Sequence, residues 1–452
     1  MFKGLMTGVS GIRGVIGEGM TPEVAMLWAG GFGTWLKGGK VVIGRDARSS
    51  GEMLSFAVKA GLTAAGCDVD DVGMTATPVC ALAVEKRGAA GGIIITASHN
   101  PQEWNALKFV RYDGRMLTAQ DMIALERIVT DGPLRSVGWN KLGRVLEWEG
   151  AEIAYINSVT GLSCLNLNKI RNRKFRVAID NINSAGSFIY PDLLEALGCQ
   201  VVPINSDGSG NFVHPPIPTI ENIQDLCATV VKHGCAVGFA VDPDGDRLSA
   251  VDEKGIPLGE ELTLALVVKA VLSRNKGNVV INSLTSQVIE DVAHDAGVEC
   301  HRTKVGEANV ASGMKELNAV IGGEGNGGIM LPELHLVRDA GVGMAIILDY
   351  LSGNKKPLSE HREKLPTYTL LKEEFLLGEI DAPDIISFAG RQYEHDQVST
   401  IDGIRVVQSD GWVQVRSSNT EPILRIYAES RDPNRAKALL NEMMGYIQNY
   451  KE

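Results

Sequence analysis

The 452-residue sequence lacks the features that mark several common classes of protein. Its seven cysteines form no CxxC pair, which disfavours a zinc site or a disulfide framework and indicates a reducing compartment. Lys and Arg number 44 against 55 Asp and Glu, and the net charge of −11 argues against a nucleic-acid partner. Apolar runs of signal-peptide or membrane-spanning length are missing as well. We therefore expect a cytoplasmic protein with no nucleic-acid or membrane partner.

Segments with strand and helix patterns alternate along most of the chain. A chain of this length should divide into several domains. Three successive runs of alternation predict α/β domains with mixed or parallel sheets and right-handed crossovers. After residue 365 short strands follow one another and an amphipathic helix closes the chain, which predicts a smaller α+β domain. We place the domains at residues 1–152, 153–254, 255–365 and 366–452.

Ser98 lies in the sequence Thr-Ala-Ser-His-Asn-Pro at residues 96–101, directly after an apolar run that predicts a buried strand. Ligands bind at loops that follow strands in α/β sheets, so Ser98 is a candidate nucleophile or phosphate carrier. The adjacent His99 raises a second interpretation, a Ser-His pair for acyl chemistry. A serine before Asn-Pro can also simply cap a turn. Lys108 is close enough in sequence to fold back toward Ser98 and carry a proton.

Asp242, Asp244 and Asp246 alternate on a loop after another apolar strand. Three carboxylates so close would raise one another's pKa unless a cation lies among them. An EF-hand loop is the competing interpretation, because Glu253 falls where its last ligand would be. However, Arg247 occupies the position that needs glycine, and strands flank the loop. A Mg²⁺ site with positions left for a phosphate fits better.

A glycine-rich stretch over residues 322–328 follows a further strand and contains the GxGxxG spacing of dinucleotide sites. That motif must open a helix, and the sequence Ile-Met-Leu-Pro that comes next does not. Glycine backbone around Glu324 and Asn326 suits a hydroxyl-rich ligand better, since both side chains bind sugar hydroxyls. A purely conformational role for the glycines stays open.

Three arginine-bearing segments are candidate phosphate sites. Residues 416–422 offer Arg416 beside hydroxyl and amide side chains, which is the chemistry of a phosphate site, although a solvated polar turn is the alternative. Arg13 is flanked by glycines and reads either as a phosphate fork or as a solvated turn. Residues 45–50 hold two arginines and two serines, typical of an anion site or of a salt-bridged domain edge.

In this order the motifs resemble those of the α-D-phosphohexomutase superfamily, which includes phosphoglucomutase, phosphomannomutase and phosphoglucosamine mutase. Residues 96–101 resemble the phosphoserine loop, 242–247 the metal loop, 323–328 the sugar loop and 416–422 the phosphate loop. The resemblance covers nearly the whole chain. It implies a heart-shaped protein with three related mixed-sheet α/β domains plus a C-terminal α+β domain around a central cleft.

The resemblance also implies a reaction. Ser98 would carry a phosphoryl group and pass it to a hexose or hexosamine 1- or 6-phosphate. The resulting 1,6-bisphosphate, which also serves as activator, would turn around and return its other phosphate. A phosphoserine adds about two negative charges near pH 7, which Mg²⁺ would offset.

Site residues follow from the same resemblance. The implied catalytic residues are Ser98, Lys108, Arg13 and His99. The implied Mg²⁺ ligands are Ser98, Asp242, Asp244 and Asp246. The implied substrate contacts are Arg247, Lys304, Glu324, Asn326, Arg416, Ser418, Asn419, Thr420 and Arg425.

One departure concerns the sugar loop, where many relatives have Ser and then His but this chain has Asn326 and Gly328. Any proton role of that histidine is absent here, and the preferred sugar stays open among glucose, mannose and glucosamine phosphates. A phosphatase or phosphotransferase using the same loops is the alternative reaction. A non-catalytic sugar-phosphate binder is disfavoured because Ser98, the three Asp residues and Arg416 are all present. We expect a monomer or a homodimer with a hexose phosphate as its substrate.

Overall fold

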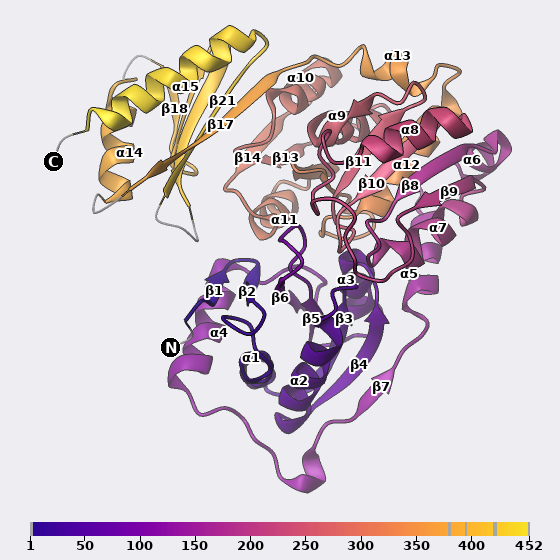
Figure 1. Ribbon diagram of the computed structural model, residues 1–452, viewed down its shortest axis with the longest axis vertical. Helices are drawn as coiled ribbons and strands as arrows, with labels where there is room; N and C mark the ends of the chain where they lie inside the picture. The colour runs from indigo at the N-terminus through magenta and orange to yellow at the C-terminus, as the bar shows by residue number, and fades with distance from the viewer. Residues whose placement is uncertain (1–2, 378–380, 394–395, 419–422, 451–452) are drawn as a thin grey trace.

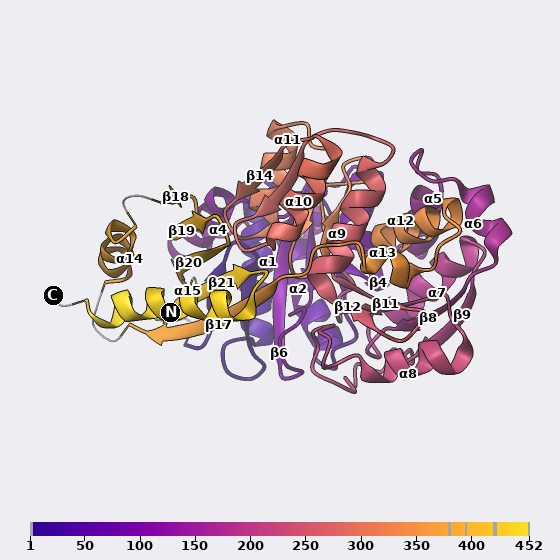
Figure 2. The same cartoon turned by 90° about the horizontal axis from the view of Figure 1, so that it is seen from above.

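The computed structural model describes residues 3–377, 381–393, 396–418 and 423–450. These residues form four sheets with helices packed on them. The N-terminal part, drawn in indigo, forms a lower lobe, and the rest of the chain lies above it (Figure 1). Seen from above, the yellow C-terminal part extends from one side of the molecule (Figure 2).

The lower lobe is built on a seven-stranded sheet. Its strands are β1 (Met6–Gly8), β2 (Gly11–Val15), β3 (Gly39–Arg45), β4 (Cys67–Met74), β5 (Gly91–Ile95), β6 (Trp104–Arg111) and β7 (Val145–Glu147). Its helices are α1 (Pro22–Trp35), α2 (Gly51–Ala64), α3 (Thr77–Lys86) and α4 (Ala119–Asp131), followed by a 3₁₀ turn (Trp139–Lys141). The strand order is β1-β2-β6-β5-β3-β4-β7, with β3 parallel to β4 and β5, and β6 antiparallel to β5.

A second, five-stranded sheet carries the metal-loop sequence. Its strands are β8 (Arg176–Asp180), β9 (Gln200–Ile204), β10 (Val237–Val241), β11 (Leu248–Asp252) and β12 (Pro257–Leu258), in the order β12-β11-β10-β8-β9. Its helices are α5 (Ala151–Thr160), α6 (Leu167–Arg173), α7 (Gly186–Ala196) and α8 (Gln224–His233). Strand β10 is parallel to β8 and antiparallel to β11, so the loop between β10 and β11 turns back at one edge.

The third sheet shares its core with the second. Its strands are β13 (Val279–Asn282), β14 (Cys300–Thr303), β15 (Ile321–Glu324) and β16 (Gly328–Met330), in the order β14-β13-β15-β16. Its helices are α9 (Gly259–Leu272), α10 (Gln287–Ala296), α11 (Glu307–Glu316), α12 (Ala340–Gly353) and α13 (Leu358–Arg362). One continuous cluster of buried apolar side chains includes Ile179 of β8, Ile281 of β13 and Ile347 of α12. Burial of a shared apolar core fixes these two sheets relative to each other.

The C-terminal sheet is antiparallel throughout and has a core of its own. Its strands are β17 (Thr369–Leu376), β18 (Gln397–Ser399), β19 (Ile404–Gln408), β20 (Gly411–Ser417) and β21 (Ile423–Ser430), in the order β17-β21-β20-β19-β18. Helices α14 (Ala382–Arg391) and α15 (Pro433–Gln448) belong to it, and the side chains of its apolar cluster all come from residues 371–450.

The predicted fold class is confirmed: three sheets are mixed and carry α/β alternation, and the last is a smaller α+β unit. The sugar-loop stretch differs from the loop that the sequence predicts. Glu324 ends β15 and Gly328 begins β16, so the stretch is the end of an antiparallel hairpin. Gly322, Gly323 and Gly328 are strand residues, at positions where the neighbouring groups leave little room for a side chain. Gly325 and Gly327 lie in the turn between the two strands, and Gly327 has a φ of 81°. Within the described residues, every helix is too short or too polar to cross a bilayer.

Candidate active site

Ser98 lies at the C-terminal end of β5 in a tight turn. Its φ of 47° is in the left-handed region, which costs a serine about 1 kcal/mol or more. The backbone N–H of Ser98 donates to Thr96 Oγ1 at 2.9 Å. The Ser98 hydroxyl is buried and donates to Asp242 Oδ2, on the second sheet, at 2.6 Å. The turn therefore presents the hydroxyl of Ser98 to the metal loop.

Arg48 holds this turn in place. Its guanidinium donates, at 2.6–3.0 Å, to the carbonyl oxygens of Ser98, Asn100, Pro101 and Trp104. Its Nε lies 3.1 Å from Asp46 Oδ2, which also accepts from Thr96 Oγ1 at 2.7 Å. Arg48 is buried, and its donors are directed at the backbone. Of the two interpretations left open for residues 45–50, the salt-bridged one holds for this arginine.

The three aspartates of the metal loop converge as predicted. All are fully buried, and each offers an oxygen within 4.8 Å of the others. Asp244 Oδ1 and Asp246 Oδ1 are buried without a hydrogen-bond partner among the described residues. Burial, and then repulsion by Asp244 and Asp246, raises the pKa of Asp242 well above its usual range. Orphaned carboxylate oxygens in this arrangement fit a divalent cation with oxygen ligands.

Cations from other elements surround the aspartates. Lys108 Nζ, from β6, lies 2.6 Å from Asp244 Oδ2 and 3.2 Å from Asp246 Oδ2. Burial opposes the charge on Lys108, but the two carboxylates outweigh burial and raise its pKa, so it remains an ammonium. Burial likewise raises the pKa of Asp244, yet Lys108 outweighs that effect and the net shift is downward. Thr77 Oγ1 donates to Asp244 Oδ2 at 2.6 Å.

His99 and two arginines lie beside the serine turn. Arg247 Nη2 is 2.8 Å from His99 Nδ1, and Arg247 Nε is 3.9 Å from both Asp242 Oδ2 and Asp246 Oδ1. The positive charge of Arg247, together with burial, lowers the pKa of His99 to about 2. His99 is thus neutral at physiological pH, a state poorly suited to carrying a proton. Arg13 Nη1 donates to Asn100 Oδ1 at 3.4 Å.

Glu324 is firmly oriented at the end of β15. Its Oε1 accepts from Asn282 Nδ2 at 2.8 Å and from the backbone N–H of Gly306 at 3.0 Å. Its Oε2 accepts from Arg338 Nη1 at 3.0 Å. Asn326 uses its Oδ1 within the hairpin, where it accepts from the N–H of Gly328 at 3.2 Å. Lys304 is exposed in the loop that precedes Gly306.

Of the predicted phosphate-loop residues, Arg416 lies on β20 of the C-terminal sheet. Arg416 Nε contacts Asp402 Oδ2 at 3.0 Å, and the same oxygen accepts from the N–H of Val305 at 3.2 Å. Arg425 is the cross-strand neighbour of Arg416, and its Nε lies 3.5 Å from Glu374 Oε1. The N–H of Ser418 donates to the carbonyl oxygen of Ile423 at 2.9 Å. Asn419 and Thr420 lie outside the described residues.

Sequence analysis missed two residues that organise the site, Arg48 and Arg338. Arg338 Nη2 contacts Asp246 Oδ2 at 2.6 Å and so joins the metal loop to Glu324. Arg48 lies in the segment 45–50 considered above, but its contacts with the Ser98 turn were not predicted, and Arg338 lies in no local motif. The only signal near Arg338 is Asp339, which caps α12 by accepting from the N–H of Val342.

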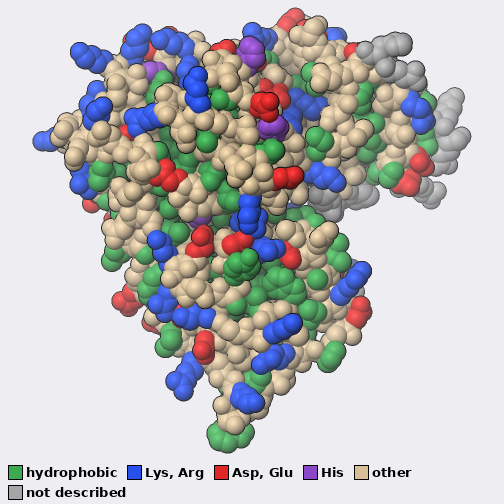
Figure 3. Space-filling model, turned by 180° about the vertical axis from the view of Figure 1, so that it is seen from behind, with side chains coloured by type: hydrophobic (Ala, Val, Ile, Leu, Met, Phe, Trp, Pro, Cys, Tyr) green, Lys and Arg blue, Asp and Glu red, His purple; other side chains and the backbone are tan. Residues whose placement is uncertain are grey.

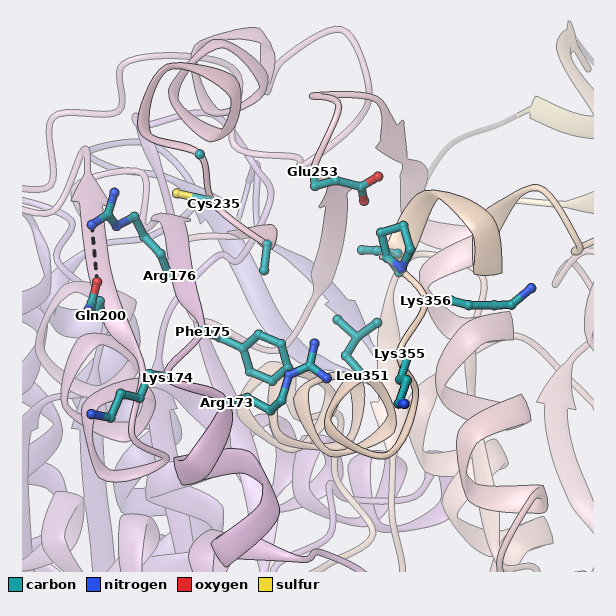
Figure 4. A pocket seen from close by; sticks show the side chains of 14 residues that line it. Arg173, Lys174, Phe175, Arg176, Gln200, Cys235, Glu253, Leu351, Lys355 and Lys356 are labelled. Carbon is teal, nitrogen blue, oxygen red and sulfur yellow. Dashed lines mark hydrogen bonds between the residues drawn. The ribbon is translucent and has the colours of Figure 1, made fainter.

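A cavity of about 500 Å³ lies apart from this site, between the start of β8 on the second sheet and the segment that joins α12 to α13. Figure 4 shows Arg173 over the ring of Phe175 and Arg176 directed at Gln200. Lys355 and Lys356 line the same cavity. Lys and Arg side chains gather on the surface at this end of the molecule (Figure 3). The residues that line it include none of the predicted site residues, so it is not part of the arrangement around Ser98.

Four family models match the chain in succession. They describe phosphoglucomutase/phosphomannomutase α/β/α domain I over residues 4–135, domain II over 153–255, domain III over 260–368 and the C-terminal domain over 379–445.

Whole-chain relatives agree with the family models. A probable phosphoglucosamine mutase of Methanopyrus kandleri is 35% identical over 444 residues, which cover 97% of each chain. A phosphoglucomutase/phosphomannomutase of Thermococcus kodakarensis is 36% identical over 446 residues, again 97% of each chain. The crystal structure of a phosphoglucomutase/phosphomannomutase family protein from Burkholderia thailandensis superposes with a TM-score of 0.87 at 28% identity, covering 100% of this chain and 99% of that one. Because the four domain models match in succession and relatives with 35–36% identity cover 97% of the chain, this chain belongs to the phosphoglucomutase/phosphomannomutase family of the α-D-phosphohexomutase superfamily.

Proposed function

We propose that this chain is a phosphohexomutase that interconverts the 1-phosphate and the 6-phosphate of a hexose or hexosamine through a phosphoserine at Ser98. The observation that carries this proposal is the hydrogen bond of 2.6 Å from the Ser98 hydroxyl to Asp242, one of three buried aspartates. A serine hydroxyl held at a cluster of carboxylates with unpartnered oxygens suits phosphoryl transfer, because the transferred charge needs a cation beside it.

Mg²⁺ would be held by Asp242, Asp244 and Asp246 together with the oxygen of Ser98 or its phosphate. When bound, it would supply electrostatic stabilisation of the transferring phosphoryl group. The protein adds fixed charge of its own, because the Lys108 ammonium lies against the aspartates and Arg13 lies beside the serine turn. The neutral His99 would accept a hydrogen bond from Arg247 and keep this guanidinium near the site.

The atoms of the proposed cycle balance without net release of phosphate. The bond from Ser98 Oγ to phosphorus breaks as the free hydroxyl oxygen of the hexose monophosphate bonds to that phosphorus. The sugar hydroxyl loses its proton, and Ser98 Oγ gains one. The hexose 1,6-bisphosphate then reverses its orientation. Its other phosphoryl group returns to Ser98, so the enzyme is regenerated and the phosphate has changed position.

Substrate contacts would come from both ends of the site. Glu324 and Asn326 would bind sugar hydroxyls. The non-reacting phosphate would be held by Arg416, Ser418, Asn419 and Thr420. Lys304 and Arg425 would add substrate contacts, and Arg247 would contact the substrate at the Ser98 end, where it lies beside His99. The relatives bear names of glucosamine, glucose and mannose phosphate mutases, and the proposed substrate class includes all three sugars.

Product analysis tests the proposal. The protein is incubated with Mg²⁺, a trace of glucose 1,6-bisphosphate and, separately, glucose, mannose, glucosamine and N-acetylglucosamine 1-phosphate. We expect the 6-phosphate of at least one sugar to form, and activity to be lost when EDTA is added and restored by Mg²⁺. Accumulation of inorganic phosphate in place of the 6-phosphate would contradict the mutase reaction and favour a phosphatase.

A further inference from the structure

Arg338 is a buried guanidinium that joins three carboxylates from three segments. Nη2 lies 2.6 Å from Asp246 Oδ2, Nη1 lies 3.0 Å from Glu324 Oε2, and Nε lies 3.3 Å from Glu307 Oε2. Only 8% of the residue is exposed. Arginine suits this position because its planar fork has donors in several directions, whereas lysine has a single nitrogen.

The missing side chain at Gly328 makes room for Arg338. A Cβ atom placed on Gly328 would lie 2.8 Å from Arg338 Cγ and still closer to Cδ. Gly328 is a strand residue of β16 and is not among the glycines with positive φ. The space taken by Arg338, and not the backbone conformation, therefore requires glycine at this position.

The backbone of Arg338 is braced on both sides. Its own N–H donates to Glu307 Oε1 at 2.9 Å, and the N–H of Asp339 donates to the carbonyl oxygen of Ile329 at 2.8 Å. The Asp339 carboxylate accepts from Tyr155 and lies 2.9 Å from His335 Nε2. A residue fixed in this way can hold a second side chain in one orientation.

We propose that Arg338 is a positioning residue that couples the metal loop to the sugar loop. Through Nη2 and Nη1 it fixes the distance between Asp246 and Glu324, and it holds the Glu324 carboxylate in one orientation for a sugar hydroxyl. This inference rests on the proposed function for its substrate, while the geometry that it uses is independent of the reaction. Arg338 acts through Glu324, so its removal and the neutralisation of Glu324 should have overlapping effects.

A double-mutant cycle tests the coupling. Arg338→Ala, Glu324→Gln and the double variant are compared in kcat/KM for the preferred hexose 1-phosphate and in Kd for the same compound by calorimetry. We expect Arg338→Ala to lower kcat/KM by about 100-fold, the double variant to be little worse than the worse single variant, and Arg338→Lys to recover part of the loss. Independent, multiplicative losses in both measurements would overturn the proposal.

Thermal unfolding provides a second test that needs no turnover. We expect Gly328→Ala to lower Tm by several degrees in the wild-type background, and to have almost no effect in Arg338→Ala, where the space is empty. Equal losses of Tm in the two backgrounds would contradict the idea that Arg338 occupies the space that a side chain at residue 328 would need. If the wild-type protein shows no mutase reaction, the proposed function fails. In that case the cycle in Kd still decides the coupling and the unfolding comparison still decides the placement of Arg338.

Discussion

The two ends of the candidate site are built differently. Around Ser98, fully buried aspartates face Lys108 and Arg338, and the contacts join three different sheets. At the other end, the positive charge of Arg416 is paired with Asp402, which also accepts a hydrogen bond from the backbone N–H of Val305. At the first end, Lys108 and Arg338 offset the negative charge of the aspartates. At the second end, the Asp402 carboxylate occupies the Arg416 guanidinium, which is proposed to bind a phosphate. This difference fits the proposal that the first end carries out phosphoryl transfer and that the second exchanges Asp402 for a substrate phosphate.

The packing of the sheets shows the same difference. The second and third sheets share one apolar cluster, while the cluster of the C-terminal sheet contains none of their side chains. The C-terminal sheet meets the third sheet through polar contacts, such as Glu429 Oε2 with the N–H of Gln287 at 2.8 Å and Arg405 Nη1 with the carbonyl oxygen of Ser283 at 3.0 Å. Polar interfaces between separate cores permit relative motion. We expect the Arg416 end to move on substrate binding while the Ser98 end stays fixed.

The largest loss of activity should come from a substitution at the Ser98 end. Ser98→Ala removes the proposed phosphoryl carrier, so we expect turnover to fall by about four orders of magnitude or more and the phosphorylated fraction to vanish from the intact mass. Ser249→Ala, which removes a buried hydroxyl from the adjacent β11, is the matched control and should keep both. Undiminished mutase activity in Ser98→Ala would end the assignment of Ser98.

A smaller effect is expected at the other end. Arg416→Ala removes a charged phosphate contact, so KM should rise more than about tenfold, with a smaller change in kcat. Arg435→Ala, which breaks an ion pair between α15 and Asp410 in the turn before β20, should leave KM unchanged. Steady-state kinetics with the preferred hexose 1-phosphate makes this comparison, and an unchanged KM in Arg416→Ala would remove Arg416 from the binding site.

Substitution of Asp402, the carboxylate paired with Arg416, tests whether Asp402 gives way to the substrate phosphate. Asp402→Asn keeps an oxygen for the N–H of Val305 but removes the charge that competes with phosphate, so we expect KM to fall by about two- to fivefold. Asp410→Asn, at the exposed ion pair with Arg435, serves as the control. A higher KM in Asp402→Asn would mean that Asp402 orients Arg416 and does not compete with the ligand.

A separate effect, on stability and not on catalysis, concerns Glu261, near the junction between the third and C-terminal sheets. Burial raises the pKa of Glu261 from 4.5 to about 8; the N–H of Ser286 opposes this shift, and Glu429 and Glu260 add to it. The folded protein keeps a proton that the unfolded chain loses above pH 4.5, so this group lowers stability as pH rises toward 8. The slope is at most about 1.4 kcal/mol per pH unit. Denaturant unfolding at pH 5 and pH 8 should show a smaller loss for Glu261→Gln than for the wild type; an equal loss would contradict the raised pKa.

The sequence was sufficient for the parts of the site that are local. Asp242, Asp244 and Asp246 stand at alternate positions of one loop, so their convergence follows from spacing alone. Ser98 was identifiable because an apolar strand leads directly into its turn. The fold class followed from the alternation of strands and helices over three successive stretches.

The long-range parts could not be predicted. Arg338 bonds Asp246, 92 residues away in the chain, and nothing in its immediate sequence distinguishes it from a solvated arginine. The segment 45–50 marked Arg48 as a candidate for a salt bridge, but its bonds to the Ser98 turn, such as the one to Asn100, 52 residues away, left no signal in that segment. Strand β6 was not anticipated, because its sequence Trp-Asn-Ala-Leu-Lys-Phe-Val-Arg contains a lysine, which is unusual in a buried strand. Lys108 can be buried there because it pairs with carboxylates of another sheet. The hairpin at Glu324 was expected as a loop because glycine-rich strands lack a strand-like composition.

The grip of Arg48 on the turn of Ser98 has a consequence for specificity. A serine tied to a buried guanidinium through its own carbonyl oxygen cannot swing toward two different sites. In the proposed cycle the Ser98 turn therefore stays in place, and the sugar must present first one end and then the other to the same oxygen. A pocket that must bind the sugar ring in two opposite orientations cannot be closely complementary to either one. We therefore expect the protein to accept several epimers and not to select one strictly.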